Sequence, residues 1–183
     1  MKLFLEEFEL NRLARRMQKG DRDAAEKLYA KLSDRVYGFC MNRVGNPHLA
    51  EDIMQDIFVK LVEHVETFER GKGTFSAWFW QLARNTVIDH YRKKRETAFS
   101  DMPDGTVEAS ATHEPHEFLN HKWEYERVRG ALKTLDREEQ ELFELRFVVE
   151  LSYKEIASVL GKSEGALRVA TNRLKSKIRT SLA

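Results

Sequence analysis

Apolar side chains recur every three or four positions along most of this chain, a spacing that predicts amphipathic α-helices. The clearest case runs from Pro47 to about Val65, where the apolar positions are Ile53, Ile57, Leu61 and Val65. Asn46 and Pro47 are residue types favoured at the N-cap and at the first helical position, so they predict where this helix begins. Similar patterns predict helices over residues 3–19 and 21–44 and, after a loop, from Thr74 to about Arg95.

The helix predicted from Thr74 to Arg95 has two different faces. Its core face carries Phe79, Leu82, Ala83, Thr86, Val87 and Tyr91. The opposite face carries Trp78, Gln81, Asn85, Asp89 and Arg92. A tryptophan beside amides and arginines on a wet face suits a surface that stacks unpaired bases and holds phosphates. The alternative is that Trp78 or Trp80 only covers a neighbouring hydrophobic cluster.

The helix predicted from Pro47 has an acidic exposed side. Its polar residues are Glu51, Asp52, Gln55, Asp56 and Glu63. One interpretation is a solvated face whose first acids favour the positive end of the helix dipole. The other is a docking surface for a basic partner helix, because Asp56 and Glu63 lie beyond the first turn, where the dipole has little effect.

The composition of the chain changes after Arg95. Residues 96–121 contain the turn sequence Pro103-Asp104-Gly105 and few large apolar side chains, a composition that predicts a linker. Helical spacing resumes from Phe118. The sequence therefore predicts an all-α protein of two small helical domains, residues 1–95 and 122–183, joined by a flexible acidic linker.

The C-terminal part carries a helix-turn-helix pattern. Ser152 with Glu155 forms a capping box for a short helix that we expect to bury Ile156, Ala157 and Leu160. Gly161 is suited to turn the chain, and Ser163 to cap a second helix. The core positions of that second helix are Leu167, Ala170, Leu174 and Ile178. Its outward side chains are Val169, Asn172, Arg173 and Ser176, flanked by Arg168, Lys175 and Arg179.

The net charge of +1 over 183 residues conceals a strongly uneven distribution. The segment Arg70–Arg95 holds seven Lys and Arg and one acid, and Lys162–Arg179 holds six and one. Residues 96–121 hold six acids and no Lys or Arg. Two basic segments separated by an acidic one predict two separate contacts with a polyanion.

Several classes of protein are disfavoured by the sequence. One cysteine, Cys40, excludes an internal disulfide framework, and we expect it to be a small core residue. The start becomes charged after five residues, so we expect no signal peptide there, and no apolar run is long enough to span a bilayer. We therefore expect a cytoplasmic protein.

Catalytic and metal-binding patterns are weak or absent. Gly161-Lys162-Ser163 imitates the end of a phosphate-binding loop, but the required earlier glycine is replaced by Ile156. The histidines near Glu114, at positions 113, 116 and 121, lie in the predicted linker and form a poor metal site. We expect no enzymatic activity, no cofactor and no metal.

Three segments, in this order, resemble the bacterial RNA polymerase sigma factors of the extracytoplasmic-function (ECF) type. They are Ala50-Glu-Asp-Ile-Met-Gln-Asp-Ile-Phe, then Phe75-Ser-Ala-Trp-Phe-Trp-Gln-Leu-Ala-Arg-Asn, then Leu151-Ser-Tyr-Lys-Glu-Ile-Ala with Gly165-Ala-Leu-Arg. The resemblance implies an alternative sigma factor with a region 2-like domain and a region 4-like helix-turn-helix. Val169-Ala170 departs from the Ser-Arg of many relatives, which puts the upstream element it reads in doubt.

The resemblance also implies roles for particular residues. Core-polymerase binding is expected at Asp52, Gln55, Asp56 and Phe58. Melting of the downstream, minus-ten element is expected at Phe68, Arg70, Lys72, Trp78, Gln81, Arg84, Asn85, Asp89, Arg92 and Arg95. Recognition of the minus-thirty-five element is expected at Lys162, Ser163, Glu164, Gly165, Arg168, Val169, Asn172, Arg173 and Lys175.

The expected partners are core RNA polymerase and promoter DNA. An anti-sigma factor is a further candidate, which the sequence does not identify. The competing hypothesis is a helix-turn-helix transcriptional regulator that acts without being a polymerase subunit. Such a regulator binds duplex DNA tightly by itself and has no use for Asn85 or Trp78.

Overall fold

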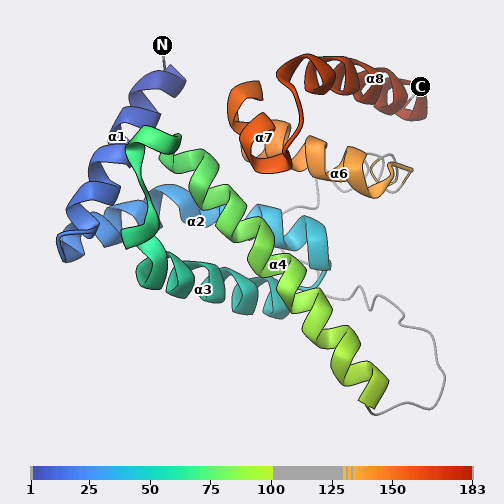
Figure 1. Cartoon of the computed structure of the whole chain (residues 1–183). Coiled ribbons are helices and arrows are strands. Elements are labelled where there is room, and N and C mark those ends of the chain that lie inside the picture. The colour runs from blue at the N-terminus through green and yellow to red at the C-terminus, as the bar shows by residue number, and fades with distance from the viewer. Residues whose placement is uncertain (1, 101–129, 131, 133, 183) are drawn as a thin grey trace, which may run out of the picture. The chain divides into compact units, whose positions relative to one another are not determined.

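The computed structural model describes residues 2–100, 130, 132 and 134–182, and every element in these ranges is a helix (Figure 1). The chain divides into two compact units, residues 1–111 and 112–183. Each unit has its own buried hydrophobic residues. The predicted all-α fold of two helical domains is therefore confirmed.

The described part of the first unit contains four long helices. They are α1 (Lys2–Met17), α2 (Arg22–Val44), α3 (Pro47–His64) and α4 (Phe75–Ser100). Two 3-10 turns, η1 (Val65–Thr67) and η2 (Arg70–Lys72), lie in the connection from α3 to α4. Helix α2 packs against α1 and α3, and α4 also packs against α1 and α3 (Figure 1).

Side-chain caps determine where the helices of the first unit begin. The side chain of Asp21 accepts a hydrogen bond from Ala24 N at 3.2 Å, and that of Asn46 accepts one from Leu49 N at 3.1 Å. Thr74 Oγ1 accepts one from Ala77 N at 3.2 Å. All three predicted caps are confirmed, and each satisfies a backbone donor that the first helical turn leaves without a partner.

Aromatic side chains fill the core of the first unit. Phe39, Phe75, Phe79 and Trp80 are among its largest fully buried side chains. The ring of Trp80 lies 5.5 Å from that of Phe39 and 5.4 Å from that of Phe79, in the edge-to-face geometry that aromatic pairs prefer. Trp80 thereby ties α4 to α2.

The predicted apolar stripe of α3 is buried throughout. Ile53 and Ile57 are 0% exposed, Leu61 2% and Val65 3%. Cys40 is also fully buried, which confirms it as a core residue.

Helix α4 continues to Ser100, five residues into the segment predicted to be a linker. Glu96 to Ser100 include no proline or glycine, and the first such residue is Pro103, so nothing in this stretch stops the helix. The rest of the predicted linker, the candidate histidines within it and most of the helix predicted from Phe118 lie outside the described residues.

The second unit contains α6 (Arg137–Phe143), a π-helical turn η3 (Glu144–Val148), α7 (Tyr153–Leu160) and α8 (Glu164–Leu182). Capping boxes begin α6, at Asp136 with Glu139, and α7, at Ser152 with Glu155. Ser163 Oγ accepts a hydrogen bond from Ala166 N at 3.2 Å and so caps α8 as predicted. Gly161 joins α7 to α8 with a φ of 66°, in the left-handed region.

The buried face of α7 differs by a small rotation from the predicted one. Ile156 and Val159 are buried, whereas Ala157 and Leu160 are half-buried. Because Ile156 and Val159 are three residues apart, they share one side of this two-turn helix, and the predicted pair lies at its margins. On α8, Leu167, Thr171 and Leu174 form the buried line.

No helix in the described part of the chain combines the length and the apolar character needed to cross a membrane.

The left-handed turn at Gly161 makes a testable prediction about the second unit. Gly161→Ala should destabilise α7 and α8 by about 1–2 kcal/mol, since a Cβ is disfavoured at this φ. Gly165→Ala is the matched control, because Gly165 is helical, is not at positive φ and has open space where the new Cβ would lie. Amide hydrogen exchange of residues 153–182 should accelerate only in the Gly161 variant, and equal protection in both variants would contradict the argument.

Candidate nucleic-acid and protein interfaces

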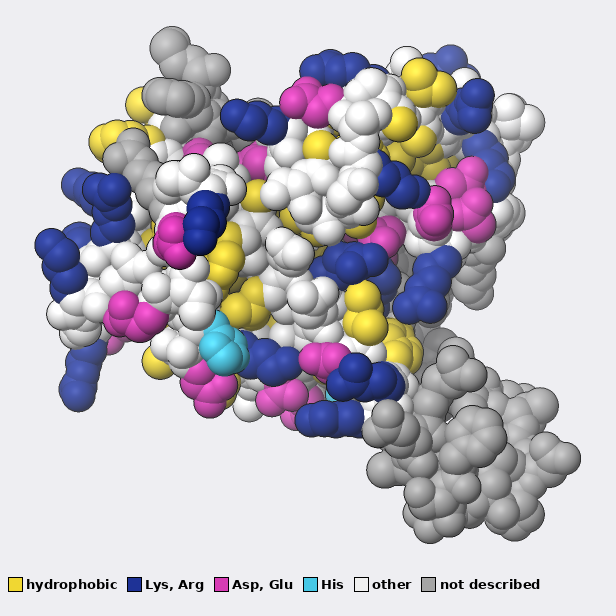
Figure 2. All heavy atoms as spheres, in the orientation of Figure 1, with side chains coloured by type: hydrophobic (Ala, Val, Ile, Leu, Met, Phe, Trp, Pro, Cys, Tyr) yellow, Lys and Arg dark blue, Asp and Glu magenta, His cyan; other side chains and the backbone are white. Residues whose placement is uncertain are grey.

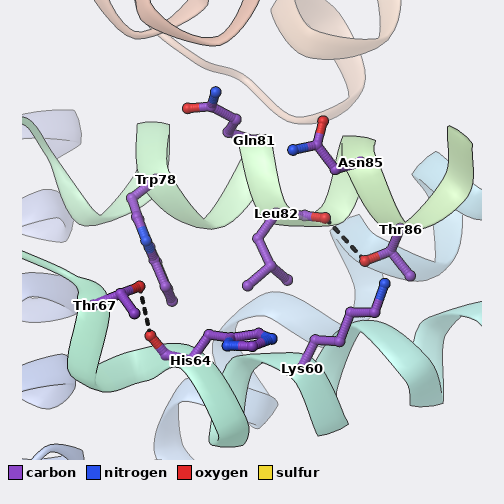
Figure 3. Close-up of a pocket in the computed structure, with 8 residues that line it drawn as sticks. All are labelled: Lys60, His64, Thr67, Trp78, Gln81, Leu82, Asn85 and Thr86. Carbon is purple, nitrogen blue, oxygen red and sulfur yellow. Dashed lines mark hydrogen bonds between the residues drawn. The ribbon is translucent and has the colours of Figure 1, made fainter. Parts of the chain in front are cut away.

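A hollow of about 360 Å³ lies between α3 and α4 on the first unit. Its lining residues are Lys60, His64, Thr67, Trp78, Gln81, Leu82, Asn85 and Thr86. Figure 3 shows Trp78 and Leu82 pointing from α4 toward α3, with His64 and Lys60 opposite them. Gln81 and Asn85 lie along the other side of the α4 ribbon in this view, and both are exposed.

Trp78 is half-buried, with one side packed on other rings and another side at the hollow. Its ring lies 5.8 Å from the ring of Phe68 and 5.6 Å from that of Phe75, so one side is packed. The remainder lines the hollow. Trp80, in contrast, is 1% exposed and belongs to the core.

The structure corrects the role predicted for Phe68. Its side chain is 5% exposed and packs against Phe75 as well as Trp78, with 5.4 Å between the rings of Phe68 and Phe75. A ring buried in this way is not available to a base. Phe68 instead supports Trp78 from behind.

For Asp89, the predicted DNA contact stays a prediction, and the structure shows the ion pairs of this residue. Its carboxylate pairs with Lys60 Nζ at 3.7 Å and with Arg92 Nη2 at 3.3 Å. A carboxylate repels phosphate, so the chemistry of Asp89 suits holding these two cations beside the hollow. Among the other basic residues predicted to contact DNA, Lys72 is exposed and pairs with Glu69 at 3.0 Å, and Arg84 is half-buried. The side chains of Arg70 and Arg95 lie outside the described set.

Sequence reasoning missed three residues of the hollow, namely Lys60, His64 and Thr67. They lie at the C-terminal end of α3 and in η1, and they meet α4 only because the two helices pack together. No local spacing pattern could have identified them.

The exposed face of α3 carries the predicted docking residues Asp52, Gln55 and Asp56. The structure adds two apolar residues to this face, Val59 at 55% and Val62 at 62% exposure. Their positions follow Gln55 by four and seven residues, a spacing that could have predicted them. The face is therefore an apolar strip bordered by acids.

The role predicted for Phe58 in polymerase binding stays a prediction. Its side chain is half-buried, and its ring lies 4.6 Å from that of Tyr29 and 6.2 Å from that of Phe79. Phe58 therefore contributes mainly to packing among α2, α3 and α4, and Val59 takes the outward position on the next residue.

On the second unit, helix α8 exposes the residues predicted to face a major groove. Val169 is 52% exposed, and Arg168, Asn172 and Arg173 are also exposed. Figure 2 shows dark blue Lys and Arg side chains along the upper right of the view, where α8 lies. Lys162 pairs with Glu138 at 2.5 Å, Glu164 with Arg168 at 3.6 Å, and the Ser163 hydroxyl acts as the cap of α8.

Lys175 and Arg168 each lie over an aromatic ring. Lys175 Nζ is 5.6 Å from the centre of the Phe147 ring, and the Arg168 guanidinium is 4.6 Å from that of Tyr153. The Arg146 guanidinium, which the sequence analysis missed, lies 5.0 Å from the Tyr153 ring centre. A hydrogen bond with Thr171, and more weakly the nearby Arg146, lowers the pKa of Tyr153 from its ordinary value.

A second hollow, of about 590 Å³, lies on this unit between α6 and α8. Phe143, Phe147, Ile178 and Leu182 supply apolar walls, and Lys175 and Arg179 supply the charges. Among the described residues, no group of three or more His, Cys, Asp and Glu is arranged to hold a metal ion.

Comparison with known proteins identifies both units. Residues 28–97 match the family model for Sigma-70 region 2, and residues 125–178 match that for Sigma-70, region 4. The ECF RNA polymerase sigma factor BldN of Streptomyces coelicolor is 34% identical over 165 residues, which cover 88% of this chain and 61% of BldN. The RNA polymerase sigma factor CarQ of Myxococcus xanthus is 30% identical over 168 residues, which cover 91% of this chain and 94% of CarQ.

Among solved structures, CnrH in complex with the cytosolic domain of CnrY has the same fold, with a TM-score of 0.68 at 24% identity. The match covers 93% of this chain and 94% of CnrH. The resemblance predicted from the three sequence segments is confirmed, and the chain belongs to the sigma-70 family of RNA polymerase sigma factors, within it to the ECF type.

Proposed function

We propose that this sigma factor binds core RNA polymerase through the exposed face of α3 and directs it to promoters that its two units recognise. Helix α8 reads the minus-thirty-five element in the major groove. The hollow between α3 and α4 receives an unpaired base of the minus-ten element. The activity needs no catalytic group, cofactor or metal, and it belongs in the cytoplasm with polymerase and DNA.

The observation that carries this proposal is the half-buried Trp78 at a hollow with amide and basic side chains. Extracting a base from a duplex costs a few kcal/mol, and stacking on an aromatic ring returns about 1–3 kcal/mol. Stacking on Trp78 alone therefore roughly balances the loss. Hydrogen bonds from Asn85 or Gln81 and phosphate contacts by Arg84 and Arg92 supply the remaining free energy that strand opening needs.

The docking face on α3 has the composition of a protein interface. Val59 and Val62 provide exposed apolar area, and Asp52, Gln55 and Asp56 adjoin it on the N-terminal side of the same helix face. Interfaces commonly have such an apolar centre with a polar rim. The acids select a basic partner surface, as expected for the clamp helices of the polymerase.

A regulator that binds duplex DNA without polymerase is the alternative function. It uses the helix-turn-helix but leaves both the acidic face of α3 and the hollow without a role. The sigma-factor proposal uses all three surfaces.

We also include an anti-sigma factor among the proposed partners. The sigma factor RpoE of Bartonella quintana was solved in complex with the anti-sigma factor NepR. The apolar hollow with a basic rim on the second unit is a surface of the kind that a protein partner covers.

Promoter-specific transcription tests the proposal as a whole. The purified chain added to core RNA polymerase should produce specific initiation, and Asp56→Arg should weaken core binding by about 2–5 kcal/mol through charge reversal at the docked face. Asp34→Arg, which reverses an exposed acid on α2, is the control and should bind core normally. Tight promoter binding with no initiation by the wild type would favour the independent regulator. Normal core binding by Asp56→Arg would mean that the α3 acids form a solvated face with no docking role.

Two substitutions on α8 separate base reading from phosphate binding. Arg173→Ala should relax sequence preference at one base pair of the minus-thirty-five element, because Arg pairs with the edge of guanine. Lys175→Met keeps an aliphatic stem over Phe147 but removes the charge. It should therefore weaken binding to all DNA sequences alike and reduce the slope of log affinity against log salt concentration by about one. Binding of a panel of single-base promoter variants at several salt concentrations measures both effects, and identical behaviour of the two variants would contradict these roles.

Strand opening depends on Asn85 in a way that the template can reveal. Asn85→Ala should lose about 1–3 kcal/mol of open-complex stability on a duplex promoter, as expected for losing a paired contact with a base edge. On a promoter already mismatched at the minus-ten element, the variant should recover much of the lost open-complex stability. Asn42→Ala, an exposed amide on α2, is the control. Equal loss on both templates would indicate a docking or folding defect, and no loss on either would exclude a role for Asn85.

A further inference from the structure

The loop that leads from α3 into α4 is held at both ends by side chains from the N-terminal helix region. This loop, residues 65–76, contains η1, η2 and the first residues of α4. Gln18 contacts its beginning and Glu7 contacts its end. Both residues precede the segment 28–97 that matches the region 2 family model.

Gln18 fixes the start of the loop through backbone contacts. Its Nε2 donates to Val65 O at 2.8 Å and to Phe68 O at 2.9 Å. The two carbonyl oxygens belong to the first residue of η1 and to the residue that follows η1, and η1 contributes Thr67 to the wall of the hollow. One amide group therefore links both ends of η1 to the N-terminal helix region.

Glu7 fixes the end of the loop. Its Oε1 accepts hydrogen bonds from Phe75 N at 2.8 Å and Ser76 N at 3.4 Å, and its Oε2 accepts one from Ser76 Oγ. Asn11 Nδ2 donates to the same carboxylate at 2.6 Å and orients it. These are N–H groups of the first turn of α4, so a carboxylate from α1 acts as a second cap beside Thr74, where the helix dipole also favours negative charge.

The two anchors bear directly on the hollow. Trp78 lies in the first turns of α4, a few residues after the Glu7 contact, and it packs on Phe68, whose carbonyl Gln18 holds. Thr67 lies between the two carbonyls bound by Gln18. Both walls are therefore supported by α1 and the residue that follows it, although neither Glu7 nor Gln18 lines the hollow.

We propose that Glu7 and Gln18 are positioning residues for promoter opening. They hold the loop and Trp78 in the geometry that receives an unpaired base, and they do so without contact with DNA. Rigid placement before binding matters here because the energy balance of base extraction is nearly even, so ordering a loose loop at that moment would remove the net gain. This inference rests on the proposed function of the hollow.

Three variants test the positioning role. Gln18→Met keeps the length of the side chain and removes the donor to both carbonyls. Glu7→Gln keeps the shape and removes the charge at the start of α4. Glu9→Gln makes the same charge change on α1 but at a residue that pairs with Lys31 of α2, at 3.0 Å, and it is the matched control.

The rate of open-complex formation is measured with polymerase reconstituted from each full-length variant, on a duplex promoter and on one with a pre-opened minus-ten element. Gln18→Met and Glu7→Gln should slow open-complex formation about tenfold or more on the duplex promoter. On the pre-opened promoter the same rate should fall less than about threefold, and core binding should be unchanged. Amide exchange of residues 65–78 should accelerate in both variants and not in Glu9→Gln.

Two results would overturn the inference. One is opening by Gln18→Met and Glu7→Gln at the rate of Glu9→Gln on the duplex template. The other is an equal loss on both templates together with weakened core binding, which would reduce the contacts to general support of the fold. A wild-type chain that fails to initiate at all would instead overturn the proposed function, so the two failures are distinguishable.

Discussion

Burial of Phe75, Phe79 and Trp80 fixes the rotation of α4 about its axis, and this constraint decides which of its side chains stay at the surface. With those rings inside, Gln81 and Asn85 are exposed and Trp78 lies at the boundary. A helix that packed with a different rotation would lose several large aromatic contacts, each buried aromatic side chain contributing roughly 1.5–3 kcal/mol. The proposed melting surface is therefore as well defined as the core beneath it.

Acidic side chains moderate the charge on both proposed DNA surfaces. Asp89 pairs with Lys60 and Arg92 beside the hollow, and on α8 Glu164 pairs with Arg168. Exposed pairs of this kind contribute only about 0–1 kcal/mol to stability, so a phosphate can replace the acid at little cost. The acids also hold the cations in place before DNA arrives, which favours defined contacts over general attraction to any polyanion.

The two units differ in how they present their proposed contacts. In the second unit, α8 is an almost regular helix whose outward residues are read directly from its own periodicity. In the first unit, the hollow is assembled from α3, η1 and α4, with support from Glu7 of α1 and from Gln18. A duplex groove accepts a regular helix, whereas a single extruded base needs walls on several sides, so the two surfaces match the two forms of DNA in the proposed function.

The sequence by itself determined the helices, their caps and the family. Asp21, Asn46, Thr74 and Ser152 act within a few residues of their own position, and the stripe from Ile53 to Val65 repeats along one helix, so local chemistry is sufficient to read them. The exposure of Asn172 and Arg173 follows from the same periodicity. Only the tertiary structure decided that Phe68 is buried and Phe58 half-buried, that Lys60 and His64 line a hollow with α4, and that Glu7 caps a helix 68 residues away. These contacts join segments whose separation along the chain carries no periodic signal, and they exist only once the helices have packed.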